Sequence, residues 1–331
     1  MQKIYLFCLA IIVSLILISC EKDFNLNAEW KDITIVYSIL DQDDAEHYIK
    51  ITKAFTTGEN GNAIEIAQIP DSLYYDTTDL EVWVSEWKDG IEKKSYPVNP
   101  VLDTNKESGA FFSDWQILYK FDADLDEDNI YKLKIENLTS GKIILSESLI
   151  VHDFTIDKPR AGGSASFTSV NPTDIIWFSA KNGRRYQITI RFNFKEKSFG
   201  SDTIERYTDW IFSPVNSLNT NGGREMKIQY SGQGFYDNIN ATVPYDDPAL
   251  EGNVDARIHG YVDYIFSVAD DELNTYLDIN EPSNSIVEDR PGYTNIDNGI
   301  GIFCSRYNKT RSLPLSAPSA EKLREQGLQF E

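Results

Sequence analysis

The order of apolar and polar residues predicts short β-strands along most of the chain. Residues 33–40 form a nearly continuous apolar run, and residues 47–55 alternate as the strand that returns beside it. Asp89 and Gly90 separate two further alternating runs, a pair that is typical of a tight hairpin turn. The strands predicted in the first half of the chain are 33–40, 47–55, 80–87, 91–98, 116–121, 131–135 and 142–151. Strands at this short spacing favour an antiparallel β-sandwich.

A change of pattern at residues 155–163 predicts a domain boundary, because one proline and two glycines interrupt the strands there. We therefore expect a mainly β fold, with a sandwich domain over 32–154 and a second β-rich domain with short helices over 164–331. Residues 56–79 read as a long irregular loop, and 235–255 carry mixed signals. Further strands of the second domain are predicted at 186–195, 257–268 and 299–307. Short helices are predicted at 270–277 and 319–323.

One short motif predicts the fold of the first domain more specifically. Leu125 precedes Tyr131, which begins an alternating run with Leu133 and Ile135. The arrangement resembles the tyrosine corner of immunoglobulin-like and fibronectin-type domains. This resemblance implies an immunoglobulin- or fibronectin-like sandwich in which residues 131–135 form the strand before the last.

The first residues carry a targeting signal. Lys3 precedes an apolar core at 4–18, and a small residue then stands before Cys20. This junction resembles a bacterial lipobox, which implies a signal peptide over 1–19, a diacylglycerol and an N-acyl chain on Cys20, and a tether over 20–31. More than one acyl chain holds a domain stably on a bilayer. A retained signal anchor and an ordinary cleaved signal are the alternatives.

The residues after Cys20 bear on which membrane face the protein occupies. Glu21, Lys22 and Asp23 place a lysine between two acids. They resemble the short tag that sends Bacteroidota lipoproteins to the outer face of the outer membrane. We therefore expect a lipid-anchored protein of the outer membrane that faces the cell exterior, with the inner leaflet as the alternative.

Charge and cysteine content narrow the choice of partners and cofactors. The formal net charge of −21 opposes a nucleic-acid partner, because like charges repel. Cys8 lies in the signal and Cys20 is the acylation site, so Cys304 is left without a cysteine to pair with. A zinc site of several thiolates is excluded, and Cys304 reads as a buried strand residue. We expect no cofactor apart from the covalent lipid.

The sequence holds no familiar catalytic signature. We find no nucleophile elbow, zinc-protease helix, phosphate-binding loop or dinucleotide fingerprint. His47, His152 and His259 are far apart in the sequence and read as structural residues. The acidic segment 122–128 lacks the glycine and glutamate of an EF-hand, which leaves a solvated turn or another kind of calcium site. We therefore predict a protein without enzymatic activity and without a metal centre.

Aromatic residues are the more promising class, since the chain has 18 Tyr and 17 Phe. Alternating aromatics usually belong to a core, and we assign Trp83 there. Exposed aromatics in loops suit protein interfaces or sugar stacking. The candidate ligand or partner contacts, in or near predicted loops, are Tyr74, Tyr75, Phe111, Phe112 and Trp115.

Three short motifs suggest a surface modification. An aspartate, then a serine or threonine, stands before Leu73, Thr78 and Ile204. These motifs resemble the O-glycosylation site of Bacteroidota envelope proteins. The candidate acceptors are Ser72, Thr77 and Thr203.

Taken together, the chain after the signal resembles a family of Bacteroidota outer-membrane lipoproteins of unknown function. Besides the lipobox and the tag, the resemblance rests on the apolar strand 35–40 and on the return strand Tyr48-Ile49-Lys50-Ile51. It implies a partner such as a TonB-dependent receptor or a barrel-assembly complex. We therefore expect a non-catalytic surface lipoprotein that serves as accessory or binding subunit of an outer-membrane barrel complex. A glycan- or peptide-binding surface module is the alternative.

Overall fold

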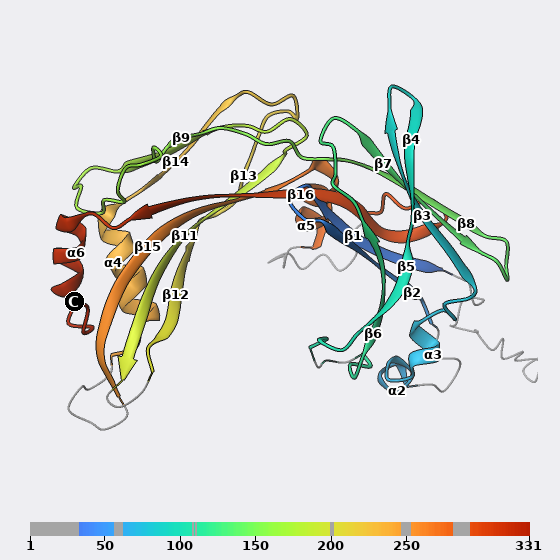
Figure 1. The fold of residues 1–331 in the computed structure, drawn as a ribbon, viewed down its shortest axis with the longest axis horizontal. Helices are drawn as coiled ribbons and strands as arrows, with labels where there is room; N and C mark the ends of the chain where they lie inside the picture. The colour runs from blue at the N-terminus through green and yellow to red at the C-terminus, as the bar shows by residue number, and fades with distance from the viewer. Residues whose placement is uncertain are drawn as a thin grey trace, which may run out of the picture.

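The computed structural model describes residues 33–55, 62–107, 109, 111–198, 202–245, 253–280 and 292–331. The predicted signal peptide, Cys20 and the tether lie outside these residues. The described chain forms two lobes joined by a long curved sheet (Figure 1). The mainly β fold with short helices that the sequence predicts is confirmed. None of the helices in the described parts is long and apolar enough to cross a membrane.

The largest sheet of the described residues has nine strands and runs through both lobes (Figure 1). Its pairs are antiparallel except for one parallel pair, which lies where the lobes meet. Along the sheet the strands are β12 (Ile204–Ile211), β11 (Arg185–Ser198), β15 (Val254–Ala269), β16 (Gly299–Pro314), β1 (Thr34–Asp41), β2 (Glu46–Lys53), β6 (Gln116–Asp122) and β5 (Asn99–Asp103), and β13 (Val215–Asn216) pairs with β11.

The N-terminal lobe is a sandwich, because alternate residues of two facing sheets form one core. Val36 and Ile49 of the large sheet meet Val82 and Leu133 of the second sheet in this core. Trp83 points the other way and is 40% exposed, so its assignment to the core is wrong. The second sheet consists of β4 (Ile91–Pro97), β3 (Leu80–Lys88), β7 (Ile130–Asn137) and β8 (Ile143–Leu149).

Two local features of the sandwich agree with the sequence. Asp89 and Gly90 both adopt positive φ, 52° and 77°, as the turn between β3 and β4 requires. The fully buried Tyr131 accepts a hydrogen bond at its hydroxyl from the backbone N–H of Asp126, at 2.8 Å. This is the bond expected of a tyrosine corner.

Strand β16 belongs to both lobes. Its first half pairs in parallel with β1, from Gly299 beside Thr34 to Arg306 beside Asp41. Its second half pairs with β15 in the C-terminal lobe. Phe303 is therefore part of the sandwich core, although it lies in the sequence predicted for the second domain. The large sheet thus continues across the boundary expected at residues 155–163.

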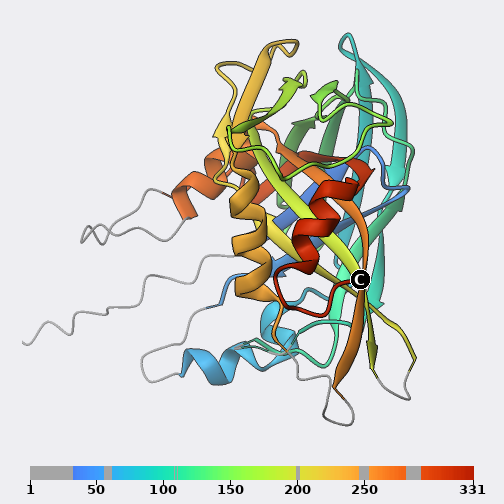
Figure 2. The same cartoon turned by 90° about the vertical axis from the view of Figure 1, so that its left-hand side faces the viewer.

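The C-terminal lobe has its own core between the large sheet and a third sheet. Trp177 and Met226 of the third sheet meet Ile188 and Phe266 of the large one. Two helices, α4 (Gly232–Thr242) and α6 (Ala317–Arg324), lie side by side against this core (Figure 2). The Tyr236 hydroxyl of α4 donates to the carbonyl of Ser319 in α6 at 3.2 Å. The third sheet consists of β14 (Glu225–Tyr230), β10 (Thr173–Phe178) and β9 (Ile156–Lys158).

The remaining helices correct one prediction and confirm another. Residues 62–79 are not wholly irregular, since they contain α2 (Ala63–Ala67) and α3 (Pro70–Leu73). The Asn62 side chain accepts from the N–H of Ile64 and caps α2, and Pro70 begins α3. The helix predicted at 270–277 is present as α5 (Asp271–Asn280).

Candidate functional site

The outer face of β1 is unusually apolar for a sheet face that is turned away from the sandwich core. Val36 and Leu40 point into the core, so Ile35, Tyr37 and Ile39 point outward. Tyr37 is 40% exposed and Ile39 is 42% exposed. A strand that is apolar on both faces is expected to meet something on each side.

A groove lies on this face, between β1–β2 and the segments that carry α3 and residues 106 and 111. Its volume is about 470 Å³. The strands contribute its floor and the other two segments contribute its wall. The residues that line it are Ile35, Tyr37, Lys50, Thr52, Lys53, Ala54, Phe55, Leu73, Tyr74, Lys106 and Phe111.

Polar bonds hold the wall together, and one of them, from Lys53 of β2, joins it to the sheet. Lys53 donates from its ammonium to the carbonyl of Asp71 at 2.6 Å. Lys106 donates in the same way to the carbonyl of Phe112, whose own N–H donates to the carbonyl of Ala67 at 2.8 Å. Backbone carbonyls of the wall therefore hold two of the groove's lysines in place.

Aromatic packing stabilises the wall. Trp115 is half-buried, with its ring centroid 5.6 Å from that of Tyr74 and 4.9 Å from that of Phe112. Such ring pairs contribute about 0.5–1.5 kcal/mol each beyond their buried area. The structure thus brings Tyr74, Phe112 and Trp115 together as a packing cluster.

The exposure expected of the candidate aromatics is correct for only part of the set. Tyr74 and Tyr75 are 5% and 8% exposed, so their prediction as exposed loop residues is wrong. The Tyr75 hydroxyl bonds to the Thr34 hydroxyl at 2.9 Å, and its ring belongs to the sandwich core. Phe111 is 53% exposed at the mouth of the groove. The role of these residues in binding stays a prediction.

The groove is positively charged at its lining, in contrast to the chain as a whole. Lys50, Lys53 and Lys106 line it, and no acidic residue does so among the described ones. Among the residues that the structure describes, none of these three lysines forms a salt bridge with a carboxylate. Burial lowers the pKa of Lys106, and the nearby Lys50 ammonium lowers that pKa further. An anionic group placed between these two lysines would relieve their repulsion.

Sequence reasoning missed Tyr37, Lys50 and Lys106. The apolar residues of the predicted strand 33–40 occupy both of its faces. This continuous apolar run was the one sequence feature that could have indicated that the outer face of the strand is covered or binds a partner. Nothing in the sequence indicated that Lys106 would lie near Lys50, because the two are brought together by tertiary packing.

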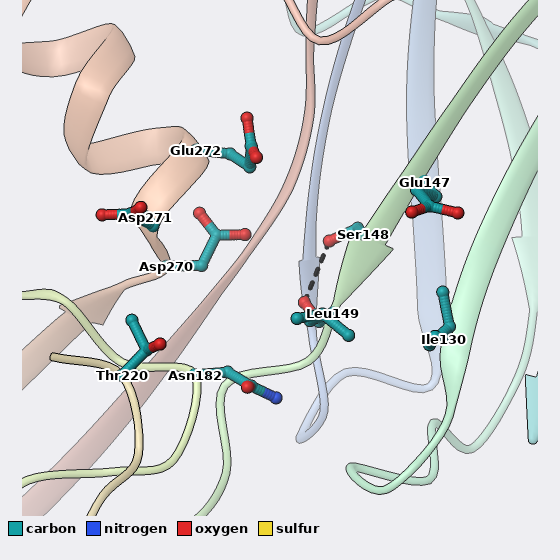
Figure 3. Close-up of a pocket in the computed structure, with 9 residues that line it drawn as sticks. All are labelled: Ile130, Glu147, Ser148, Leu149, Asn182, Thr220, Asp270, Asp271 and Glu272. Carbon is teal, nitrogen blue, oxygen red and sulfur yellow. Dashed lines mark hydrogen bonds between the residues drawn. The ribbon is translucent and has the colours of Figure 1, made fainter. Parts of the chain in front are cut away.

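A second hollow, of about 270 Å³, lies between the lobes and is acidic (Figure 3). Its carboxylates include Glu147, Asp270 and Glu272. The Asp270 carboxylate is already engaged, since it accepts from the N–H groups of Leu273 at 2.8 Å and Ser305 at 2.7 Å. Across the described ranges, no group of three or more histidine, cysteine or carboxylate side chains is arranged to hold a metal ion.

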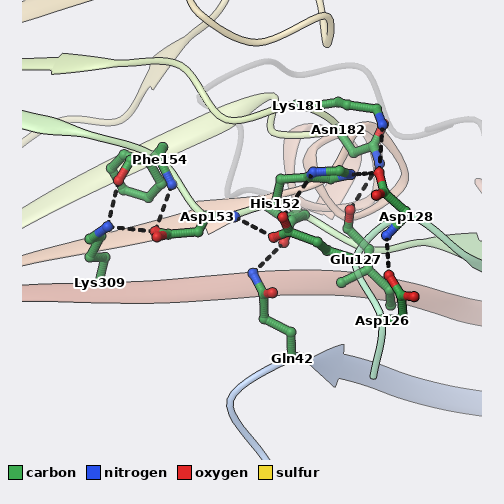
Figure 4. A network of polar contacts seen from close by, with 12 residues as sticks. Gln42, Asp126, Glu127, Asp128, His152, Asp153, Phe154, Lys181, Asn182 and Lys309 are labelled. Atoms are coloured by element: carbon green, nitrogen blue, oxygen red, sulfur yellow. Dashed lines mark hydrogen bonds and ion pairs between the residues drawn. The ribbon is translucent and has the colours of Figure 1, made fainter. Parts of the chain in front are cut away.

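The acidic segment 122–128 takes part in a polar network where the lobes meet (Figure 4). His152 Nδ1 lies 3.3 Å from a Glu127 oxygen, and the Lys181 ammonium lies 3.2 Å from Asp128. The Glu127 carboxylate also accepts from the N–H of Asp153 at 2.8 Å. These contacts join the N-terminal sandwich to the start of the C-terminal lobe. Glu127 and Asp128 therefore have a structural role.

The three candidate glycosylation residues occupy different settings. Ser72 lies in α3 and is half-buried, and Thr77 is half-buried in the turn that follows. Thr203 is exposed just before β12. Of the three, Thr203 is therefore the most accessible to a transferase.

The groove between β1–β2 and its wall is the site best suited to bind a partner, because it combines exposed aromatic surface with cationic groups. No protein-family model matches the chain, and no curated protein matches it.

Proposed function

We propose that this chain is a non-catalytic lipoprotein of the outer-membrane surface that serves as accessory or binding subunit of an outer-membrane barrel complex. The lipid on Cys20 would anchor it, in keeping with its resemblance to Bacteroidota surface lipoproteins. The groove on the outer face of β1–β2 would receive an acidic segment of the partner. The observation that carries the proposal is the cationic and aromatic lining of this groove in a chain of net charge −21.

The chemistry of the lining favours an acidic segment with apolar side chains. Tyr37 and Phe111 offer contact area at low entropic cost. Lys50 and Lys106 offer ammonium donors, and each ammonium has three hydrogen atoms, of which Lys106 gives one to Phe112. Since charge complementarity mainly governs specificity and association rate, binding should weaken as salt concentration rises.

Co-purification tests the proposal. The protein is extracted gently with detergent from outer membranes, and its partners are identified by mass spectrometry. We expect an outer-membrane barrel protein to accompany the wild type and to be largely lost with Lys50→Glu or Phe111→Ala. Lys93→Glu is the matched control, because Lys93 is an exposed lysine of β4 on the opposite sheet. Recovery of the lipoprotein alone, or equal recovery of the partner with Lys50→Glu, would contradict the proposal.

The lipid anchor is tested separately. Cys20→Ser should move the protein from the membrane fraction to the soluble fraction. The N-terminal peptide of the wild type should carry the mass of a diacylglycerol and an acyl chain on Cys20. An unmodified N-terminal peptide that begins elsewhere would exclude the anchor without bearing on the groove.

A further inference from the structure

A third hollow, of about 690 Å³, lies on the outer face of the C-terminal lobe, over strands β11, β12 and β15. Two tyrosines flank it, Tyr207 from β12 and Tyr261 from β15. They are 60% and 59% exposed, which is unusual for large aromatic side chains on a sheet. Nothing in the proposed function uses this surface.

The hollow lies over an irregularity in strand pairing. Phe192 pairs with Val262 but Phe194 pairs with His259, so Gly260 and Tyr261 together lie opposite the single residue Asn193. This is a β-bulge, a feature that re-aims side chains. A Cβ on Gly260 would lie 2.8 Å from the Asn193 carbonyl oxygen. The position therefore favours glycine, and Gly260 contributes only backbone to the lining of the hollow.

Polar side chains line the hollow beside Tyr261 and pack against the Tyr207 ring. The Asn193 amide donates to an Asp263 oxygen at 2.7 Å. Arg191 donates to both oxygens of Asp209, at 2.7 and 2.8 Å, and its guanidinium carbon lies 3.9 Å from the centroid of the Tyr207 ring. These contacts hold the polar groups and the Tyr207 ring in fixed positions.

The charges around the hollow are balanced. Two basic side chains line it, Lys195 and Arg206, and so do two acidic ones, Glu205 and Asp263. Lys195 pairs with Glu205 at 3.2 Å. The surface therefore has no excess charge to attract an ion, in contrast to the lysine-lined groove of the other lobe. A ligand suited to it is uncharged and rich in hydroxyl groups, with apolar faces for the tyrosine rings.

We propose that this hollow binds a neutral oligosaccharide. Tyr207 and Tyr261 lie two strand intervals apart, about 10 Å, which is the scale of a short sugar chain. Their rings contact the C–H faces of the sugar. Asp263 accepts from sugar hydroxyls while it holds Asn193, because a carboxylate accepts more than one hydrogen bond.

Titration calorimetry on the purified protein, against neutral hexasaccharides of glucose, xylose, mannose and N-acetylglucosamine, tests the proposal. We expect at least one to bind, and Tyr207→Ala and Tyr261→Ala each to weaken that binding about three- to tenfold. Tyr245→Ala is the matched control, because Tyr245 is 67% exposed and does not line the hollow. Each variant is first checked for an unchanged melting temperature, and both substituted side chains lie on the surface.

Two results would overturn the proposal: no binding by any of the four saccharides, or equal binding by the wild type and the Tyr207 and Tyr261 variants. Lys50→Glu should leave saccharide binding unchanged, because Lys50 lies in the groove of the other lobe. Loss of the barrel partner and loss of saccharide binding are thus separate outcomes, and either can fail without the other.

Discussion

Replacement of Asp270 by alanine should destabilise the protein at pH 5, and this loss of stability should disappear or reverse at pH 8. Asp270 is 4% exposed and lies directly before α5. One carboxylate oxygen accepts from the N–H of Leu273 and caps this helix, and the other accepts from the N–H of Ser305 in β16. The side chain therefore joins α5 to the strand that both lobes share.

The magnitude follows from the two bonds that are lost. Loss of a helix cap costs about 0.5–2 kcal/mol. A buried N–H left without a partner, here that of Ser305, costs about 1–3 kcal/mol more. We therefore expect Asp270→Ala to lower the free energy of unfolding by about 3 kcal/mol below pH 4, where the wild-type carboxyl is neutral in both the folded and the unfolded chain.

The pH dependence follows from burial, which raises the pKa of Asp270 from 3.8 to about 7 despite the N–H donors. Between these values the folded protein holds a proton that the unfolded chain has released. The contribution of Asp270 to stability is therefore complete below pH 4 and falls as pH rises to 7, by about 1.4 kcal/mol per pH unit. Above pH 7 it changes no further. The total fall, about 4.5 kcal/mol, exceeds the loss of about 3 kcal/mol caused by the substitution, so the variant should be more stable than the wild type by about 1–2 kcal/mol there.

Urea unfolding at pH 5 and pH 8, followed by tryptophan fluorescence, measures the effect. The difference between wild type and variant isolates Asp270, since the other carboxyls are common to both proteins. Asp271→Ala is the control, because it removes a 66% exposed carboxyl from the same turn. An equal loss of stability at the two pH values would refute the reasoning, as would a larger loss at pH 8.

Three further predictions concern single residues. Tyr131→Phe should lower the free energy of unfolding by about 1–3 kcal/mol, because the Asp126 N–H loses its acceptor, and urea unfolding checks this. Cys304 should not react with iodoacetamide until the protein is unfolded, since burial raises the pKa of its thiol. Peptide mass spectrometry measures this, and alkylation of Cys304 in the folded protein would contradict it. Thr203 should carry a glycan in the native protein more readily than Ser72 or Thr77, because it is exposed, and site mapping would refute this if only Ser72 were modified.

Local signals identified much of the N-terminal sandwich and one helix outside it. The hairpin of β3 and β4 follows from Asp89 and Gly90, which accept positive φ at little cost. The bond of the Tyr131 hydroxyl joins residues close in sequence. The helix α5 begins with acids and follows Asp270, a residue type suited to cap a helix. In each case the interacting groups are neighbours in the chain, so their residue types were informative.

Features that depend on distant residues were not predictable in the same way. The helices α2 and α3 are short, and such helices are stable only through tertiary contacts, here with β2 and residue 112. Tyr74 and Tyr75 resemble loop residues by sequence, yet Trp115 and Thr34 cover them. Exposure is a property of what packs against a side chain, and this cannot be read from the side chain itself.

The sequence by itself therefore determined the class of fold, the turns and the alternation of each strand, because side-chain period and turn chemistry act over a few residues. The tertiary structure alone decided that β16 pairs in parallel with β1 and so joins the two lobes. It alone placed Lys50 beside Lys106, and Tyr261 across a bulge from Asn193. Strand partner and register depend on which distant surfaces bury the most apolar area together.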